Sequence, residues 1–193
     1  MNNKNHRTVL GMSGGKDSSA LAIFMKEKEP DLEVEYFFTD TGKELPEVYE
    51  FLDKIQASYG IKVHYLKPET GNSNDSPFDY FHKINNFFLP SAKARWCTVN
   101  LKLKPFEKWI KPTLEDGGSI TSLVAIRADE NREGYRPTND QVKVRFPFIE
   151  YGIDKQGVRN ILERAGLGMP SYYKWRSRSG CTFCFYQQKI EWV

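Results

Sequence analysis

The stretch "LGMSGGKDSSALAIFM" (Leu10–Met25) places two glycines, a lysine, an aspartate and three serines between two apolar runs. The residues that lead into it, "RTVLGM" (Arg7–Met12), have the apolar and β-branched composition of a short buried strand. The residues that follow, "SSALAIFMKEKE" (Ser18–Glu29), predict a helix with Ala20, Leu21, Phe24 and Met25 on its apolar face. A strand, a glycine turn and a helix bring backbone N–H groups and the positive helix end to one point. The stretch therefore predicts an anion-binding loop within an α/β fold.

This loop differs from an ordinary P-loop. That motif needs a glycine five residues before its Gly-Lys pair and a Ser or Thr directly after the lysine. In this chain Leu10 and Asp17 stand at those two positions. The chemistry of the loop still suits a phosphate, because glycines allow close backbone approach while serines and a lysine donate hydrogen bonds. The predicted phosphate-binding residues are Ser13, Gly14, Gly15, Lys16, Asp17 and Ser18.

Asp17 is the unusual member of the loop. A carboxylate beside a phosphate needs a cation between the two groups. Mg²⁺ binds carboxylate and phosphate oxygens and keeps several of its waters, so we expect Asp17 to hold Mg²⁺. The alternative is a glycine turn that merely begins a helix.

The rest of the chain alternates predicted strands with predicted helices. Strands are expected in "LEVEYFFTDTG" (32–42), "IKVHYLKP" (61–68), "SITSLVAIRA" (119–128) and "VRFPFIE" (144–150), the last interrupted by Pro147. Helices are expected at 45–60, 78–90, 103–112 and 154–168, and an irregular, mobile loop at 69–77. This alternation predicts an α/β, Rossmann-like fold with a mainly parallel sheet and helices on both faces.

Three separate segments are expected to meet in one pocket. Ligands of open parallel sheets bind beyond the carboxyl ends of the strands. The loop at 13–18, Asp40 and Arg127 each follow a predicted strand. Arg132 and Arg136 come shortly after Arg127, and arginine is suited to bidentate recognition of a polyanion. Asp40 as an ordinary turn residue and the arginines as a solvated surface are the alternatives.

Composition excludes several classes of protein. The chain has 193 residues, 39% of them hydrophobic and 27% charged, which is ordinary for a soluble globular protein. A formal net charge of +3 permits contact with nucleic acid but does not argue for it. We find neither a membrane-length apolar run nor an apolar segment behind "MNNKNHR", so we expect a cytoplasmic protein without membrane partners. Three cysteines argue against a disulfide framework.

The motif SGGKDS (13–18) resembles the PP-loop of the N-type ATP pyrophosphatase superfamily. These enzymes hold the pyrophosphate of ATP while a nucleophile attacks the α-phosphorus. "FTDTGKELPEVYEF" (38–51) is similar to the Asp-Thr-Gly and Pro-Glu stretch of the phosphoadenosine-phosphosulfate (PAPS) reductases, whose strand end lies beside the nucleotide. "AIRADENREGYRP" (125–137) resembles the segment that contacts the phosphate or sulfate end, with Ala125 in place of a glycine. The resemblance implies an adenine nucleotide, either ATP or APS/PAPS, bound by Asp40, Arg127, Arg132 and the loop.

The cysteines form a lone Cys97 and a CxxC pair, Cys181 and Cys184. From the residues alone such a pair is a zinc half-site, a redox pair or chance, and three thiols are fewer than the four ligands that zinc normally takes. The spacing resembles the cluster-binding pattern of adenylylsulfate (APS) reductases, with Trp96-Cys97 where two cysteines would stand. The resemblance implies a 4Fe-4S cluster held by Cys97, Cys181 and Cys184, with one iron open to carry sulfide. Cys97 as a bare nucleophile or persulfide carrier stays an alternative.

The intact SGGKDS favours an ATP-dependent thiolation enzyme, in which Lys16, Asp17 and Cys97 are the candidate catalytic residues. The resemblance leaves three alternatives: an APS or PAPS reductase, a subunit like that of sulfate adenylyltransferase, and a non-catalytic nucleotide-binding subunit. A sulfur-donor protein (a cysteine desulfurase or a thioredoxin-like protein) is an expected partner. A nucleic-acid acceptor could follow the lysines of 102–111 with Trp96 and Trp109, although a solvated helix face with core tryptophans explains these residues equally well.

The resemblance extends from Ser13 to Cys184, and no linker divides the chain. We therefore expect a single PAPS-reductase-like nucleotide-binding domain over residues 1–193. The chain stops at "KIEWV", where a helix is predicted to start, so we also expect a longer parent protein whose C-terminal part is missing.

Overall fold

The computed structural model describes residues 5–134 and 137–192, so Arg136 lies outside the described residues. Its centre is a five-stranded sheet in the order β3-β2-β1-β4-β5, in which every neighbouring pair of strands is parallel. The strands are β1 (His6–Gly11), β2 (Val34–Thr39), β3 (Val63–Leu66), β4 (Ser119–Leu123) and β5 (Val142–Arg145). The predicted α/β class with a parallel sheet is confirmed.

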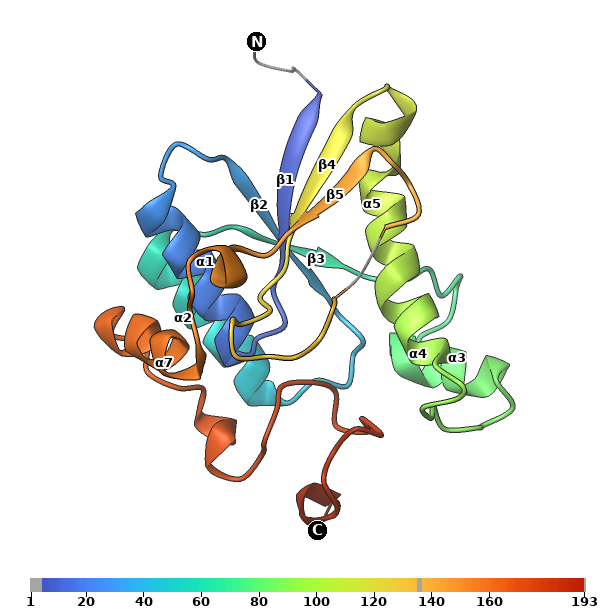
Figure 1. The fold of residues 1–193 in the computed structure, drawn as a ribbon. Coiled ribbons are helices and arrows are strands. Elements are labelled where there is room, and N and C mark those ends of the chain that lie inside the picture. The colour runs from blue at the N-terminus through green and yellow to red at the C-terminus, as the bar shows by residue number, and fades with distance from the viewer. Residues whose placement is uncertain (1–4, 135–136, 193) are drawn as a thin grey trace.

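Helices cover both faces of this sheet (Figure 1). On one face α1 (Lys16–Lys28), α2 (Pro46–Tyr59) and α7 (Lys155–Arg164) share the larger apolar core with the sheet. On the other face α5 (Lys104–Glu115) packs through Ile110, Phe106 and Trp109 against Val9 and Ile120. The remaining helical segments are α3 (Pro77–Ile84), α4 (Trp96–Thr98), the π-helical η1 (Val99–Leu103), α6 (Pro147–Glu150), and the 3₁₀ turns η2 (Ser171–Lys174) and η3 (Lys189–Trp192).

The strand order creates a defined crevice. From β1 the chain moves outward through β2 and β3, then returns to place β4 and β5 on the other side of β1. The order therefore reverses between β1 and β4. In open parallel sheets the crevice at such a switch point, beyond the carboxyl ends of the strands, is where ligands bind. The loop at 13–18 leaves β1 at this point.

Helix α1 is more deeply buried than the sequence predicts. An amphipathic helix with one apolar face is the expectation, but Ser18 through Ile23 and Met25 are all buried. The reason is that α1 lies between the sheet and α7, so it is covered on two sides. Ser18 and Ser19, which the amphipathic pattern leaves outside the apolar face, are part of this buried surface.

Several predicted elements end earlier than expected: the strand expected at 119–128 ends at Leu123, the helix expected at 154–168 ends at Arg164, and two further elements show the physical reason. The strand expected at 144–150 ends at Arg145, and Pro147 begins the short helix α6 instead. Proline has no N–H for a sheet ladder and is well suited to the first turn of a helix. The helix expected at 78–90 ends at Ile84, because Asn86 and Phe87 adopt positive φ angles of 51° and 60°. By contrast, α2 starts at Pro46 and ends before Gly60 with φ +58°, as its sequence predicts.

Candidate functional site

The loop between β1 and α1 is built around Gly14. Its φ of +66° lies in the left-handed region, and a Cβ at this position would lie 2.5 Å from Cγ1 of Val48 on α2. Glycine is therefore the residue that permits both the turn and the close packing of the loop on α2. Ser18 closes the loop from the other end, since its Oγ accepts from the Ser13 N–H at 3.1 Å and lies 3.0 Å from the Ser13 Oγ. The backbone of α1 thus begins at a fixed position beside the crevice.

The first turn of α1 lacks a side-chain cap. Gly15 stands at the N-cap and has no side chain to cap the helix, and the Lys16 N–H donates to the Tyr173 hydroxyl at 3.4 Å. The first N–H groups of a helix have no intrahelical partner and carry the positive end of the helix dipole. Lys16, Asp17 and Ser18 of this turn line a cavity of about 580 Å³. The turn therefore offers N–H donors to an anion in that cavity.

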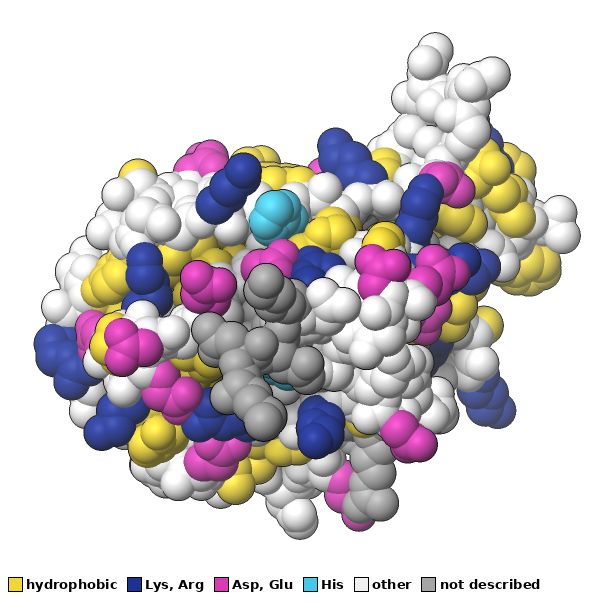
Figure 2. All heavy atoms as spheres, turned by 90° about the horizontal axis from the view of Figure 1, so that it is seen from above, with side chains coloured by type: hydrophobic (Ala, Val, Ile, Leu, Met, Phe, Trp, Pro, Cys, Tyr) yellow, Lys and Arg dark blue, Asp and Glu magenta, His cyan; other side chains and the backbone are white. Residues whose placement is uncertain are grey.

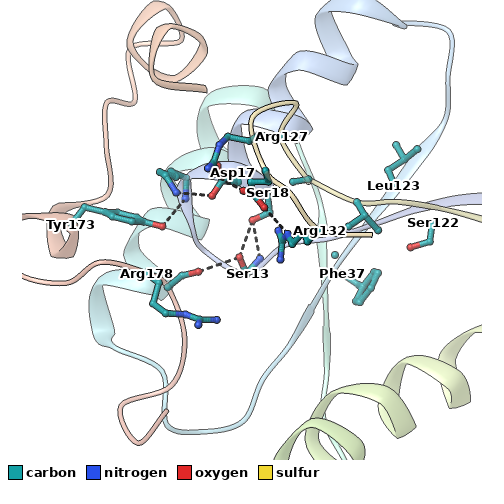
Figure 3. Close-up of a pocket in the computed structure, with 16 residues that line it drawn as sticks. Ser13, Asp17, Ser18, Phe37, Ser122, Leu123, Arg127, Arg132, Tyr173 and Arg178 are labelled. Atoms are coloured by element: carbon teal, nitrogen blue, oxygen red, sulfur yellow. Dashed lines mark hydrogen bonds and ion pairs between the residues drawn. The ribbon is translucent and has the colours of Figure 1, made fainter. Parts of the chain in front are cut away.

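An ion-pair network joins this turn to the segment after β4 (Figure 3). The Asp17 carboxylate lies 2.6 Å from the Lys16 Nζ and 3.0 Å from the Arg127 Nη1. Arg127 also contacts Asp129 at 2.9 Å and Glu130 at 2.7 Å. Burial alone would lower the pKa of the Arg127 guanidinium, but its hydrogen bonds to Asp129 and Asp17 outweigh burial and raise that pKa above the ordinary value. Lys16 and Arg127 are therefore a preformed pair of cations that share one carboxylate.

The cavity combines charged and apolar walls. Its charged lining consists of Lys16, Asp17, Arg127, Glu130, Arg132 and Arg178, so four cations face two carboxylates. Phe37, Leu123, Val124 and Ala125 line the rest, together with Gly11, Ser13, Ser18, Ser122, Tyr173 and Ser179. An anionic group at the α1 turn and a flat apolar group against β2 and β4 fit such a cavity.

Six of the predicted site residues line this cavity: Ser13, Lys16, Asp17, Ser18, Arg127 and Arg132. Gly14 and Gly15 shape the turn without lining it. Asp40 points elsewhere: its carboxylate accepts hydrogen bonds from the Gly42 N–H and the Tyr49 hydroxyl and lies 3.3 Å from the Lys67 Nζ. With 7% of its surface exposed, Asp40 holds the turn after β2. Its contact with a nucleotide stays a prediction.

The sequence analysis misses the part of the site that comes from the C-terminal third of the chain. The buried Tyr172 hydroxyl donates to the Gly14 carbonyl at 2.8 Å, and Tyr173 lies with its ring 5.2 Å from the Lys16 Nζ. Ser179 approaches Ser13, with 3.4 Å between the two hydroxyl oxygens, and Arg178 lines the cavity. The only sequence signal is the aromatic and basic run "SYYKWRSRSG" (171–180), which carries no spacing that links it to a loop some 160 residues away.

Magnesium fits the donors of the cavity. Asp17 and Glu130 supply carboxylate oxygens and Ser13 and Ser18 supply hydroxyls, which are the hard ligands that Mg²⁺ prefers. Asp17 is held by two cations, so a phosphate that enters must either displace this carboxylate or share a cation with it. Asp17 is the residue that would hold Mg²⁺ against the phosphate oxygens.

The CxxC pair lies in a turn that is anchored to the loop after β2. The Thr182 N–H donates to the Lys43 carbonyl at 2.7 Å, and Cys181 pairs with Glu44 in an isolated β-bridge. The hydrogen bond from the Cys181 thiol lowers the pKa of Cys184, and burial opposes that shift. The pKa of Cys181 rises, because Cys181 donates the shared proton and burial also disfavours its thiolate. One of the two sulfurs is thereby favoured as a thiolate.

Cys97 stands in the first turn of the long helical segment that begins at α4, and its neighbours in the sequence approach the CxxC turn. Its neighbour Trp96 packs on Phe78, with ring centroids 5.3 Å apart, and Phe183 of the CxxC turn stacks on the same ring at 5.9 Å. Arg95 also contacts Tyr186. Within residues 5–134 and 137–192, however, no three His, Cys, Asp or Glu side chains are arranged as a metal site. The three thiols are thus brought to one region but not into one ligand set, and the cluster stays a prediction.

The lysines of 102–111 give little support to a nucleic-acid track. Trp109 is packed between Phe37, Phe106, His64 and the guanidinium of Arg7. Lys108 pairs with Glu69, and Lys111 lies 3.3 Å from Glu115. The solvated helix face with a core tryptophan is the interpretation that these contacts favour.

Comparison with known proteins agrees with the class that the fold defines, an α/β protein with a nucleotide-binding fold. The phosphoadenosine phosphosulfate reductase domain matches residues 7–145. The chain therefore belongs to this family. An uncharacterized protein of Methanocaldococcus jannaschii is 32% identical over 124 residues, which are 64% of this chain and 23% of that protein. The tRNA-specific 2-thiouridylase MnmA of Lactobacillus delbrueckii is 25% identical over 197 residues, covering 86% of this chain and 50% of MnmA.

Solved structures share the fold at low sequence identity. A PAPS reductase from Candida auris in a phosphate complex superposes with a TM-score of 0.64 at 16% identity, over 88% of this chain and 77% of that chain. FMN adenylyltransferase of Candida glabrata in complex with ATP gives 0.53 at 11% identity, over 93% and 53%. The U34-tRNA thiolase NcsA of Methanococcus maripaludis with its [4Fe-4S] cluster gives 0.52 at 14% identity, over 97% and 63%.

The chain spans 23%, 34% and 48% of the length of three curated relatives that it matches. Within the part of the chain that the structure describes, no helix is both long and apolar enough to cross a membrane.

Proposed function

We propose that the protein binds ATP in the cavity at the carboxyl ends of β1 and β4 and transfers its adenylyl group to an acceptor, as the first step of sulfur transfer. The observation that carries the proposal is the pair of cations, Lys16 and Arg127, held at the start of α1. A triphosphate needs such a concentration of donors and positive charge. FMN adenylyltransferase, which shares the fold, has a structure in complex with ATP, and this supports an adenine nucleotide as the ligand of the cavity.

The apolar wall would receive the adenosine. Phe37 on β2 and Leu123 at the end of β4 stand on either side of the crevice, and Val124 and Ala125 add backbone groups beside them. With the base against this wall, the phosphates extend toward Lys16. The α-phosphorus then lies between the apolar wall and the α1 turn, where an acceptor can reach it.

In the chemical step an acceptor oxygen attacks the α-phosphorus, and the bond to the β-phosphate oxygen breaks as pyrophosphate leaves. Lys16, Arg127 and the first N–H groups of α1 would stabilise the negative charge that grows on the pyrophosphate. Bound Mg²⁺, held by Asp17, would offset further phosphate charge. A sulfur nucleophile then attacks the carbon that bears the adenylated oxygen, the carbon–oxygen bond breaks and AMP leaves.

The cysteines supply the sulfur chemistry in this proposal. Cys181 and Cys184 share a proton across the CxxC turn, and Cys97 lies on the neighbouring segment. These three thiolates would hold a 4Fe-4S cluster if Cys97 moves toward the pair, and the cluster would supply an iron that carries sulfide. The relative named as a thiolase with its [4Fe-4S] cluster supports this part of the proposal. The sulfur itself would come from a donor protein.

Reduction of PAPS is a second candidate. It is favoured by the four cations of the cavity, which exceed what one pyrophosphate group requires, and by the family to which the chain belongs. In that reaction a thiolate attacks the sulfate sulfur, the bond from sulfur to the phosphate oxygen breaks and adenosine 3′,5′-bisphosphate leaves. A second thiol then displaces sulfite as a disulfide forms.

Product analysis separates the two candidates. The protein is incubated without oxygen either with Mg²⁺-ATP, sulfide and a nucleic-acid acceptor or with PAPS and a dithiol, and AMP, pyrophosphate and sulfite are quantified. AMP and pyrophosphate in equal amounts from ATP support adenylyl transfer. Sulfite from PAPS with no pyrophosphate from ATP would overturn it in favour of reduction.

Metal content tests the cysteine part of the proposal. Protein purified without oxygen should contain iron and sulfide, and Cys181→Ser should lose both. Cys97→Ser is the more critical variant, because Cys97 is the thiol that the structure leaves apart from the other two. If Cys97→Ser keeps the iron content and the visible spectrum of the unmodified protein, the three-cysteine assignment is wrong.

A further inference from the structure

A second cavity of about 570 Å³ adjoins the nucleotide cavity. The two share Lys16, Arg127 and Tyr173, so they meet at the pair of cations. Its walls come from α7 and from the segment 169–177, which includes η2. The mechanism described above makes no use of this cavity.

The charged residues that line the second cavity are of one sign, and two of them, Lys16 and Arg127, also pair with the Asp17 carboxylate outside it. Six of its eleven lining residues are cationic, and the described lining contains no Asp or Glu. They are Lys16, Arg127, Lys155, Arg159, Lys174 and Arg176. Figure 2 shows a different pattern on the face at the amino ends of the strands, where acidic and basic side chains are intermingled. A cavity lined by one sign of charge concentrates counter-ions, and here these are anions.

Arg176 gives independent evidence for a ligand. Only 3% of its surface is exposed, and it lines the cavity. One of its Nη groups donates to the Cys181 carbonyl at 2.8 Å, whereas its Nε has no hydrogen-bond partner among the described residues. A buried charged donor without a partner is costly, because its lost hydration is not replaced. An anionic oxygen in the cavity would supply the missing acceptor.

The layout of the cations fits a chain of phosphates better than one isolated anion. Lys155 and Arg159 are one turn apart on α7 and therefore share a face, and both are exposed at the cavity mouth. Lys174 on the segment 169–177 also lines the cavity and is exposed. Trp175, which follows Lys174 in the sequence, does not line the cavity, but its side chain is half exposed at 51% next to residues that do. Cations that follow a backbone, with an aromatic ring on which a base can stack, are the pattern of single-stranded nucleic-acid binding.

We propose that this second cavity binds the phosphate backbone of a single-stranded nucleic acid, and that this strand is the acceptor of the adenylyl group. The identification of the strand as acceptor rests on the proposed function. Because the two cavities meet at Lys16 and Arg127, a strand held along α7 leads to the phosphates of the bound nucleotide. The strand thus reaches the bound nucleotide beside its phosphates.

Binding of a fluorescein-labelled single-stranded RNA oligonucleotide, followed by anisotropy at several salt concentrations, tests the site. Arg159→Ala removes a lining cation, and Arg164→Ala is the matched control, since Arg164 lies on the same helix but pairs with Glu27 outside the cavity. Arg176 is unsuited to the test because its buried side chain supports the fold.

We expect Arg159→Ala to weaken RNA binding about fivefold and to reduce the slope of log affinity against log salt by about 0.7, the value for one lost phosphate contact to a single strand. Arg164→Ala should change the affinity less than about twofold, because an exposed ion pair outside the cavity contributes little. Equal effects of the two substitutions, or no RNA binding by the unmodified protein, would overturn the inference.

Turnover of the unmodified protein separates this inference from the proposed function. If ATP yields pyrophosphate but RNA does not bind, the nucleic-acid site is wrong and the adenylyl transfer stands. If RNA binds through Arg159 but ATP yields no pyrophosphate, the anionic site stands and the proposed function fails. Competition by inorganic phosphate alone, with no binding of the oligonucleotide, would show a site for a single anion and would overturn the nucleic-acid assignment.

Discussion

Substitution of Asp17 should change the affinity for ATP in a direction that tests its proposed role. In the structure its carboxylate lies between Lys16 and Arg127, the position that a phosphate of the nucleotide would take. Without a divalent cation, the carboxylate and the phosphate compete for the same two positive charges. Asp17→Asn should therefore increase the affinity for ATP when Mg²⁺ is removed.

The size of this effect follows from the geometry. A carboxylate and a phosphate about 5 Å apart repel each other by about 3 kcal/mol at an effective dielectric constant of about 20. The Asp17 side chain is 25% exposed, so solvent screens part of this repulsion. A net gain of about 1–2 kcal/mol remains, which corresponds to about five- to thirtyfold tighter binding of ATP in EDTA.

Isothermal titration of ATP in EDTA and in Mg²⁺ measures the effect. With Mg²⁺ present the same variant should lose more than about tenfold in turnover, because the metal ligand is gone. Asp129→Asn is the control, since Asp129 pairs with Arg127 at 2.9 Å but does not line the cavity, and it should leave the affinity in EDTA nearly unchanged. Weaker ATP binding by Asp17→Asn in EDTA would refute the reasoning, because it would show that Asp17 supports the phosphate site without a metal.

Two further predictions concern stability. Gly14→Ala should lower the free energy of unfolding by about 2–4 kcal/mol, because alanine is strained in the left-handed conformation and its Cβ displaces Val48. Urea denaturation measures this loss, and a loss below about 1 kcal/mol would contradict the prediction. Glu29→Gln should cost about 1 kcal/mol at neutral pH, because the carboxylate makes a two-point ion pair with Arg145 at 2.6 and 2.8 Å. The Arg145 hydrogen bond lowers the pKa of Glu29 below its ordinary 4.5, so this contribution is present above pH 4.5 and is lost as the pH falls through the folded-state pKa. The difference in free energy of unfolding between the unmodified protein and Glu29→Gln should therefore shrink in acid. A constant difference down to about pH 2 would contradict the proposed contribution of the Glu29–Arg145 ion pair.

Much of the fold could be predicted because its signals are local. The strand, turn and helix around 13–18 are contiguous in the sequence, and Arg127 and Arg132 follow a strand whose carboxyl end must face the same crevice. The helix α2 carries both of its boundary signals, Pro46 and Gly60. In each case the property that decides the structure lies within a few residues of the position concerned.

The parts that could not be predicted depend on contacts between distant segments. Tyr172 and Gly14 are 158 residues apart, and nothing in the sequence near either one indicates their hydrogen bond. The burial of Ser19 on α1 depends on the position of α7, which the helical pattern does not contain. The inward direction of Asp40 depends on Tyr49 and Lys67, which come from the next helix and the end of the next strand. Sequence patterns identify elements, but the side-chain directions at the site are set by tertiary packing.

The central claim is that the start of α1 holds the phosphates of ATP through Lys16. The most direct measurement is calorimetric titration of Mg²⁺-ATP into the unmodified protein, Lys16→Ala and Lys26→Ala, which removes a lysine from the far end of the same helix. The account predicts binding by the unmodified protein and by Lys26→Ala with equal affinity, and at least about tenfold weaker binding by Lys16→Ala, the loss of a charged hydrogen bond. Equal affinity of all three proteins, or no binding of ATP to any of them, would contradict it.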